Sequence, residues 1–253
     1  MPVCALTPFI APEPVSTRSG LIMKPWAAVD DDLVAQVRNM VVGALNSSRS
    51  LEVALEVTRQ TLQWSDQLIK AFESANPLPS PVACVPGCTY CCHNQVEVTP
   101  SEVFLLARVI GQYFSPQKQE QLKEKTLRTA ALKVDKSKAD LAATRQTQPC
   151  PLLAEDKCVA YPWRPFMCRA MHSLDQEHCR TSFTAGDLSG DAYYLHRYVF
   201  PMSLSAGLAA GFRAVGCQTP VLELTQALGQ ALLSPWLAER WLAGENVFAD
   251  VTS

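Results

Sequence analysis

Several features that would assign the chain to a broad class are missing from its sequence. It has no run of about 18 uncharged apolar residues, so no transmembrane helix is predicted. Its 11 glycines include no G-x-G-x-x-G order, which gives no support to a Rossmann or P-loop nucleotide site. The 22 basic and 24 acidic residues leave a net charge of −2, so no overall field favours nucleic acid or an anionic membrane. Alternation of apolar and polar residues, the pattern of strands, is scarce.

Composition indicates how the chain is organised. Residues 1–28 are rich in Pro, Ser and Thr without periodicity and predict an extended N-terminal arm. Met1–Pro12 is apolar but carries no cationic residue, and prolines interrupt it, so we predict no signal peptide and a cytoplasmic protein. With 48% apolar residues, the 253-residue chain has enough material for its own core. We predict a single helical domain over residues 29–244 and a C-terminal tail over residues 245–253.

Apolar residues recur every three or four positions through much of this domain, as in amphipathic helices. They predict one helix from Asp30 to about residue 45 and another from about Ser50 to Phe72. Thr99–Glu102 has the pattern of a capping box with proline at the first helical position, and therefore predicts a third helix. Further elements are predicted as a short extended segment at Val96–Thr99 and helices over about 191–215, after Thr219-Pro220, and from Ser234-Pro235 to Gly244.

A polar segment runs from Ser115-Pro116 to about Gln146. It holds eight Lys or Arg against four Asp or Glu, a local charge of +4. We interpret it as a solvated helix that covers one side of the domain, with contact to an acidic protein partner as the alternative.

Ten cysteines are an unusual content for a chain of this kind. Disulfide frameworks belong to short secreted chains, whereas clustered thiols in a reducing compartment more often bind metal or carry out redox chemistry. Eight cysteines fall in two stretches, here called the first cysteine segment (residues 84–92) and the second cysteine segment (residues 150–179). Cys4 and Cys217 lie outside both and are predicted to be free or buried thiols.

The spacing within the two segments indicates a shared metal centre. Pro86-Gly87 allows the sharp turn that would bring Cys84 and Cys88 toward one metal. Cys91 and Cys92 are adjacent, so we expect their side chains to diverge. The gaps of the second segment are too wide for a site of its own, and we expect its thiols to meet the first segment across the fold. The predicted fold is mainly α, an irregular helical bundle with two Cys-rich loops tied together by a metal centre.

These residues together resemble the YkgJ-type cysteine-cluster family, described as zinc- or iron-chelating proteins. The pattern is C-x3-C-x2-C-C, then C-P-L-L, then C-x2-Y-x2-R-P-x2-C-R, and it covers about residues 84–180. With Cys179 added, the predicted metal ligands are Cys84, Cys88, Cys91, Cys92, Cys150, Cys158, Cys168 and Cys179. A distant branch, the flagellin lysine N-methylases, is associated with an iron–sulfur cluster and S-adenosylmethionine. The resemblance therefore implies metal binding, with a methyltransferase-like enzyme acting on a protein side chain as an alternative.

Eight thiols fit either of two centres. They could form two closed four-cysteine zinc sites, or four of them could hold an iron–sulfur cluster. The wide spacings and the paired Cys91-Cys92 favour iron. Cys84, Cys88 and Cys91 also have the spacing of the radical S-adenosylmethionine loop, but no βα alternation follows them. A metal chaperone or scavenging protein is a further alternative.

Residues beside the thiols have two interpretations each. His93, His172 and His178 are expected at the surface or behind the ligands, with ligation as the alternative. Arg164 and Arg169 flank Cys168 and are expected to donate hydrogen bonds to sulfur, with an ordinary ion pair as the alternative. Tyr161 and Trp163 are expected to pack in the core around the loop.

Overall fold

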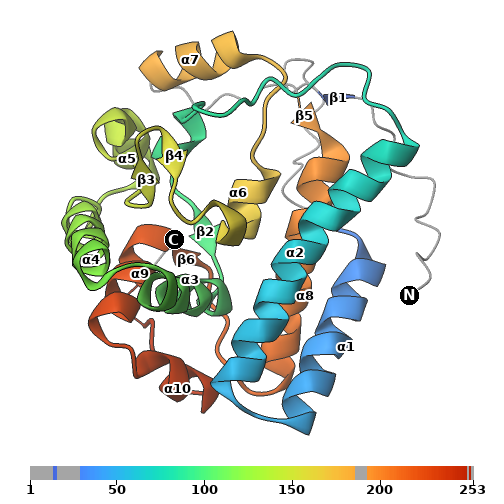
Figure 1. The fold of residues 1–253 in the computed structure, drawn as a ribbon, viewed down its shortest axis with the longest axis vertical. Helices are drawn as coiled ribbons and strands as arrows, with labels where there is room; N and C mark the ends of the chain where they lie inside the picture. The colour runs from blue at the N-terminus through green and yellow to red at the C-terminus, as the bar shows by residue number, and fades with distance from the viewer. Residues whose placement is uncertain (1–13, 16–28, 186–192, 250, 252–253) are drawn as a thin grey trace.

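The computed structural model describes residues 14–15, 29–185, 193–249 and 251. These residues form a mainly α-helical fold whose strands are each two residues long, as predicted (Figure 1). The α-helices are α1 (Asp31–Ser47), α2 (Leu51–Ala75), α3 (Pro100–Tyr113), α4 (Pro116–Ala131), α5 (Lys138–Thr144), α6 (Phe166–Ala170), α7 (Gln176–Ala185), α8 (Leu195–Ala214), α9 (Leu224–Leu233) and α10 (Leu237–Leu242). The 3-10 helices are η3 (Tyr90–His93), η4 (Arg145–Thr147) and η5 (Tyr161–Trp163). The strands form three antiparallel pairs, β1 (Pro14–Val15) with β5 (Tyr193–Tyr194), β2 (Glu97–Val98) with β6 (Leu222–Glu223), and β3 (Leu153–Ala154) with β4 (Lys157–Cys158).

Helices α1, α2 and α8 pack together as a bundle on one side of the molecule (Figure 1). Asp30 caps α1 by accepting a hydrogen bond from the Leu33 N–H, and Ser50 caps α2 in the same way from the Val53 N–H. Both predicted starts are therefore confirmed. The buried face of α1 repeats every four residues through Leu33, Val37, Val41 and Leu45, and it packs on α8.

The closest approach of α1 and α8 depends on a glycine. A Cβ atom added at Gly211 would lie 2.5 Å from the Cβ atom of Val41. We predict that Gly211→Ala lowers the free energy of unfolding by about 2 kcal/mol, because overpacking outweighs the better helix propensity of alanine. Gly43→Ala in α1 is the matched control, since nothing lies within 4 Å of its added Cβ, and it should be neutral or stabilising. Urea unfolding of both variants measures this, and equal effects would contradict the close packing.

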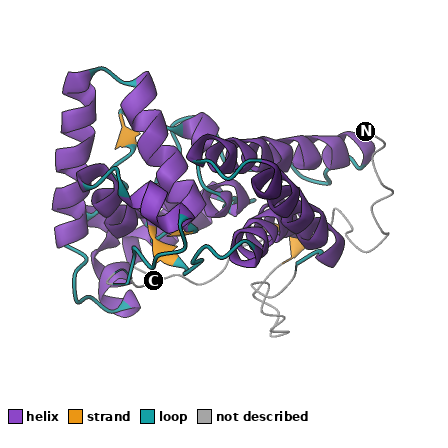
Figure 2. Cartoon of the chain, turned by 90° about the horizontal axis from the view of Figure 1, so that it is seen from below, coloured by secondary structure: helices purple, strands orange, loops and turns teal. Residues whose placement is uncertain are grey.

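The second group of helices comprises α3, α4, α9 and α10, next to the bundle (Figure 1). Figure 2 shows the chain from below, with helices making up most of it. The capping box of α3 is confirmed at Thr99 and Glu102. The helix start predicted at Thr219-Pro220 is wrong, because α9 begins at Leu224. Glu223, just before it, pairs with β2 and also caps α9 by accepting a hydrogen bond from the Gln226 N–H. In the last predicted helix, Gly244 follows the final turn with φ +100°, as predicted for a helix end.

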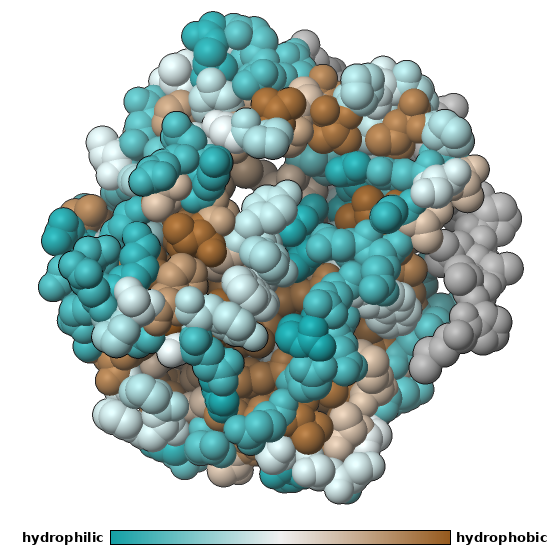
Figure 3. Space-filling view, viewed as in Figure 1, coloured by the Kyte–Doolittle hydropathy of each residue, from teal (hydrophilic) through white to brown (hydrophobic). Residues whose placement is uncertain are grey.

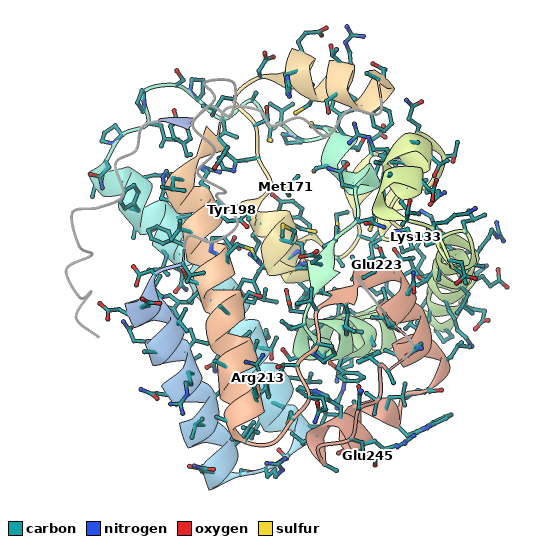
Figure 4. The ribbon with its side chains drawn as sticks, turned by 180° about the vertical axis from the view of Figure 1, so that it is seen from behind. Lys133, Met171, Tyr198, Arg213, Glu223 and Glu245 are labelled. Atoms are coloured by element: carbon teal, nitrogen blue, oxygen red, sulfur yellow. The ribbon has the colours of Figure 1, made fainter. Side chains whose placement is uncertain are left out.

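The polar segment 115–146 is not one solvated helix. Helix α4 ends at Ala131, and a turn through Asp135, with φ 56°, separates it from α5. Lys133 is only 6% exposed and donates to Glu223 at 2.7 Å and to the Thr225 hydroxyl at 3.0 Å. Lys133 and Glu223 lie side by side in Figure 4. Arg145 is also buried, so two of the eight cations belong to the interior.

One apolar cluster runs through both helix groups, from Leu33 in α1 to Leu228 in α9. Phe248 and Val251 join it, so the C-terminal tail packs on this core. Of the predicted N-terminal arm, β1 is described and pairs with β5, and the rest lies outside the described residues. No helix among the described residues is long and apolar enough to cross a membrane.

Candidate metal centre

The first cysteine segment connects α2 to β2. Val85 accepts a hydrogen bond from the Cys88 N–H at 3.0 Å, and Gly87 has φ +91°, so the sharp turn predicted at Pro86-Gly87 is present. The following 3-10 helix, η3, carries Cys91 and Cys92. Two consecutive tight turns therefore present four thiols within nine residues.

The second cysteine segment is more regular than the predicted loop. It begins with the β3–β4 hairpin, whose turn residues Glu155 and Asp156 both have positive φ, and this hairpin carries Cys158. Cys168 lies in α6 and Cys179 in α7. Short helices and a hairpin thus hold thiols that the sequence assigned to irregular chain.

Backbone hydrogen bonds join the two segments directly. The Cys150 N–H donates to the Cys92 carbonyl at 2.7 Å, and the Ala83 N–H donates to the Ser173 carbonyl at 2.9 Å. These bonds lie at the two ends of the first segment, and helix α7 packs against η3 as well. The two cysteine segments, which lie far apart in the chain, therefore contact each other through their backbones.

The cysteines fall into two groups according to which neighbouring cysteines influence the pKa of each thiol. Burial raises the pKa of Cys84, and its thiol neighbours Cys91, Cys88 and Cys179 raise it further. We call these four residues the outer set. Cys92, Cys150, Cys158 and Cys168 are called the inner set, and the pKa of Cys168 is raised by burial first and then by Cys150, Cys91 and Cys158. Cys91 is thus a neighbour of both sets.

Cys91 and Cys92 interact instead of diverging, which corrects the prediction for this pair. A side-chain hydrogen bond from Cys92 lowers the pKa of Cys91 to about 7, and the same bond raises the pKa of Cys92. A thiol with a pKa near neutrality is the first of the eight expected to become a thiolate, the form that binds metal.

The remaining inner thiols are held in their neutral form. Burial raises the pKa of Cys150 to about 11 and also raises that of Cys158. All nine cysteines in the described part of the chain are free thiols. Among the described residues, no three His, Cys, Asp or Glu side chains form a ready metal-binding group. Metal binding would therefore need movement of these thiols and the release of their protons.

The candidate ligands have the chemistry that a thiolate metal site requires. Free thiols from two segments, with no competing disulfide among them, are the ligands that zinc and iron–sulfur centres use. Four thiolates around one divalent ion carry excess negative charge, and three cations offset it near the inner set. Burial raises the pKa of Cys158 and Cys150, and Arg164 and Lys133, respectively, partly oppose that rise. The Arg169 guanidinium is close enough to interact with Cys168.

Several residues that position the thiols were not found from the sequence. Arg145 donates to the Asn94 side chain at 2.8 Å and to the Ser182 carbonyl, and its guanidinium lies 5.7 Å from the Phe183 ring centroid. Phe183 also packs against Tyr90 and His93 of η3. Arg145 and Phe183 therefore fasten α7, with Cys179, onto the helix that carries Cys91 and Cys92.

Glu102 positions α6 and its Cys168. The carboxylate is 2% exposed; one oxygen accepts from the Thr99 N–H and hydroxyl, both at 2.8 Å, and the other accepts from the Phe166 N–H at 2.9 Å. The sequence identified the first role through the capping box. It held no signal for the second, which joins α3 to α6.

Arg164 and Arg169 are bound to a carboxylate, and not to sulfur as expected. Both guanidinium groups donate to Asp66 of α2, Arg164 at 3.2 Å. The aromatic prediction is wrong for Tyr161, which is 60% exposed beneath the Arg164 guanidinium. Trp163 is half-buried, 5.1 Å from the ring of Tyr113.

The three histidines have partners within the protein. The His93 Nδ1 atom lies 3.2 Å from the Arg145 carbonyl. The backbone N–H of His178 donates to the Asp175 carboxylate. His172 Nδ1 bonds to the Ala170 carbonyl at 2.8 Å, and His172 Nε2 accepts from the Tyr194 N–H at 2.8 Å. Since a carbonyl only accepts and an N–H only donates, His172 is a neutral ring with both nitrogens engaged. Cys217 is buried, as predicted, and Cys4 lies outside the described residues.

This environment predicts a pH dependence. Burial lowers the pKa of His172 to about 4, so the unfolded state binds the extra proton first as the pH falls. Stability due to His172 is present above pH 6.5 and is lost as the pH falls to about 4, by about 3 kcal/mol in all. NMR titration of the ring proton should show a midpoint near 4 in the folded protein. A midpoint near 6.5 would contradict the buried neutral ring, and the His172→Gln variant identifies the signal.

Comparison with known proteins supplies one match. Residues 83–184 match the model of the CxxCxxCC family, described as a "putative zinc- or iron-chelating domain". The matched range begins next to Cys84 and ends in α7, so it contains all eight predicted ligands. No curated protein and no solved structure matches the chain significantly.

Proposed function

Because residues 83–184 match the model of the CxxCxxCC cysteine-cluster family, we propose that this chain binds zinc or iron through eight cysteines, Cys84, Cys88, Cys91, Cys92, Cys150, Cys158, Cys168 and Cys179. The observation that carries the proposal is the meeting of the two cysteine segments at the Cys150–Cys92 backbone bond. The eight cysteines of these two segments form no disulfide with one another.

The electrostatic neighbours of each thiol support a division into two groups of four. In this proposal the outer set of Cys84, Cys88, Cys91 and Cys179 holds one ion and the inner set holds another. Cys91 has neighbours in both sets and is the natural thiolate to be shared between them. Arg164, Lys133 and Arg169 interact with thiols of the inner set and can offset the negative charge of its thiolates. The inner set is therefore the group better able to carry excess negative charge.

Iron is the metal that we favour for the centre. The sequence arguments are the wide spacings and the paired cysteines. The low pKa of Cys91 is consistent with a thiolate that captures the metal early, for either zinc or iron. An iron–sulfur centre and a pair of zinc sites differ in colour, so they can be separated without a structure.

Anaerobic purification followed by elemental analysis and an absorption spectrum tests the proposal. We expect stoichiometric zinc or iron, with absorbance near 400 nm if the metal is in an iron–sulfur cluster. Exchange with a chelator on mild treatment would indicate a scavenging protein, whereas resistance indicates a structural or catalytic centre. Folded protein that contains no metal and has eight freely alkylated thiols would overturn the proposal.

A further inference from the structure

A groove of about 370 Å³ opens between α2, α6 and the start of α8, and none of the eight candidate cysteines lines it. Lys70 and Glu73 of α2 line it, together with Arg197 of α8. Asp66, Arg164 and Arg169 complete the charged lining. Hydrophilic side chains follow α2 across this face in Figure 3. Charged groups from three separate segments of the chain therefore converge on one open space.

The charges of the groove do not balance. Four cations, Lys70 and three arginines, face two carboxylates, which leaves a charge of +2. Asp66 accepts from both Arg164 and Arg169, so two guanidinium groups share one carboxylate. Glu73 accepts from Arg197 at 2.6 and 2.8 Å and also from His196 at 2.8 Å. Ion pairs that only join helices need one cation for each carboxylate. This groove has two cations more than that.

Donors remain for a ligand. In the bonds between described residues, Arg197 uses Nε and Nη2 toward Glu73, and Nη1 is left over. The Arg197 and Arg164 side chains are 25% and 18% exposed, so both can be reached from solvent. Lys70 is exposed, and its ammonium group makes no hydrogen bond or ion pair with the part of the chain that the structure describes.

We propose that this groove binds a small molecule through a doubly charged oxyanion, either a phosphate group or a pair of carboxylates. The remaining Arg197 Nη1 donor and the Lys70 ammonium can each give a charge-assisted hydrogen bond to either kind of oxyanion. Two negative charges neutralise the excess of the groove. Because α6 carries both Arg169 and Cys168, the bound molecule lies beside the candidate metal centre. The proposal does not depend on which metal is present, or on any being bound.

Titration calorimetry of the full chain as purified tests the proposal, with inorganic phosphate and malonate as separate probes at constant ionic strength in chloride. We expect saturable one-site binding of at least one probe. Tighter binding of phosphate would assign a phosphorylated ligand, and tighter binding of malonate a dicarboxylate. No saturable binding of either probe would overturn the proposal.

The Lys70→Gln variant removes one charge from the groove without touching a cysteine or an ion pair. It should weaken binding of the preferred probe about tenfold, the effect of one charge-assisted hydrogen bond. Lys136→Gln is the matched control, because Lys136 is an exposed lysine in the turn between α4 and α5 and does not line the groove. Its affinity should equal that of the unmodified protein. Equal affinities of the two variants would show that the binding is non-specific, and would also overturn the proposal.

Discussion

Removal of the metal under reducing, anaerobic conditions should loosen the two cysteine segments and α7 while the bundle of α1, α2 and α8 stays folded. In these stretches the strands are two residues long and α6 has five residues, so few regular hydrogen bonds hold them. Structural zinc supplies about 10 kcal/mol of binding free energy that appears as folding free energy. The bundle, by contrast, buries its own apolar faces and needs no metal.

Hydrogen exchange measured before and after chelation reports this difference. Amides of η3, the β3–β4 hairpin and α7 should exchange faster by several orders of magnitude, and those of α1 and α8 should change little. The α1 amides are the internal control for general damage. Unchanged exchange throughout residues 83–184, in protein shown to have lost its metal, would contradict a structural role for the centre.

Substitution of Cys91 should have the largest effect of any single cysteine change. Cys91→Ser removes a thiol that neighbours both sets, so we expect the bound metal to fall by more than half. Cys84→Ser and Cys168→Ser each damage one set, and each should remove about one of two metal equivalents. The variant that combines Cys84→Ser with Cys168→Ser should lose both metal equivalents.

A control variant and two contrary outcomes complete this experiment. Cys217→Ala removes a buried thiol that lies outside both sets, and its metal content should equal that of the unmodified protein. If Cys168→Ser abolished all binding while Cys84→Ser had no effect, a single centre in the inner set would replace the division into two. Equal metal content in Cys91→Ser and Cys217→Ala would contradict a ligand role for Cys91.

Helix starts could be predicted wherever their signals are local. Asp30, Ser50 and Thr99 cap helices within three residues of themselves, and all three helix starts were predicted from the sequence. The start of α9 was not predicted, because Leu222 and Glu223 pair with β2 ahead of the helix, and β2 lies far away in the chain. Lys133 and Arg145 were assigned to a solvated face because their buried partners come from other elements.

The candidate site shows the same limit. Spacing and composition sufficed to select eight of ten cysteines, since clustering is visible along the chain. Which thiols are neighbours depends on Arg145 and Phe183, which dock α7, and on Glu102, which holds α6. Arg164 and Arg169 adjoin Cys168 in sequence, yet their partner Asp66 lies about 100 residues earlier in α2. Adjacency in sequence therefore gave the wrong contact for these two arginines.

X-ray absorption at the edge of the bound metal tests the central claim most directly, because it reports the atoms around the ion. Cysteine ligation predicts a first shell of sulfur at about 2.3 Å with four neighbours per metal. A first shell of nitrogen or oxygen at about 2.0–2.2 Å would contradict cysteine ligation and, with it, the account of residues 83–184 as a thiolate metal centre.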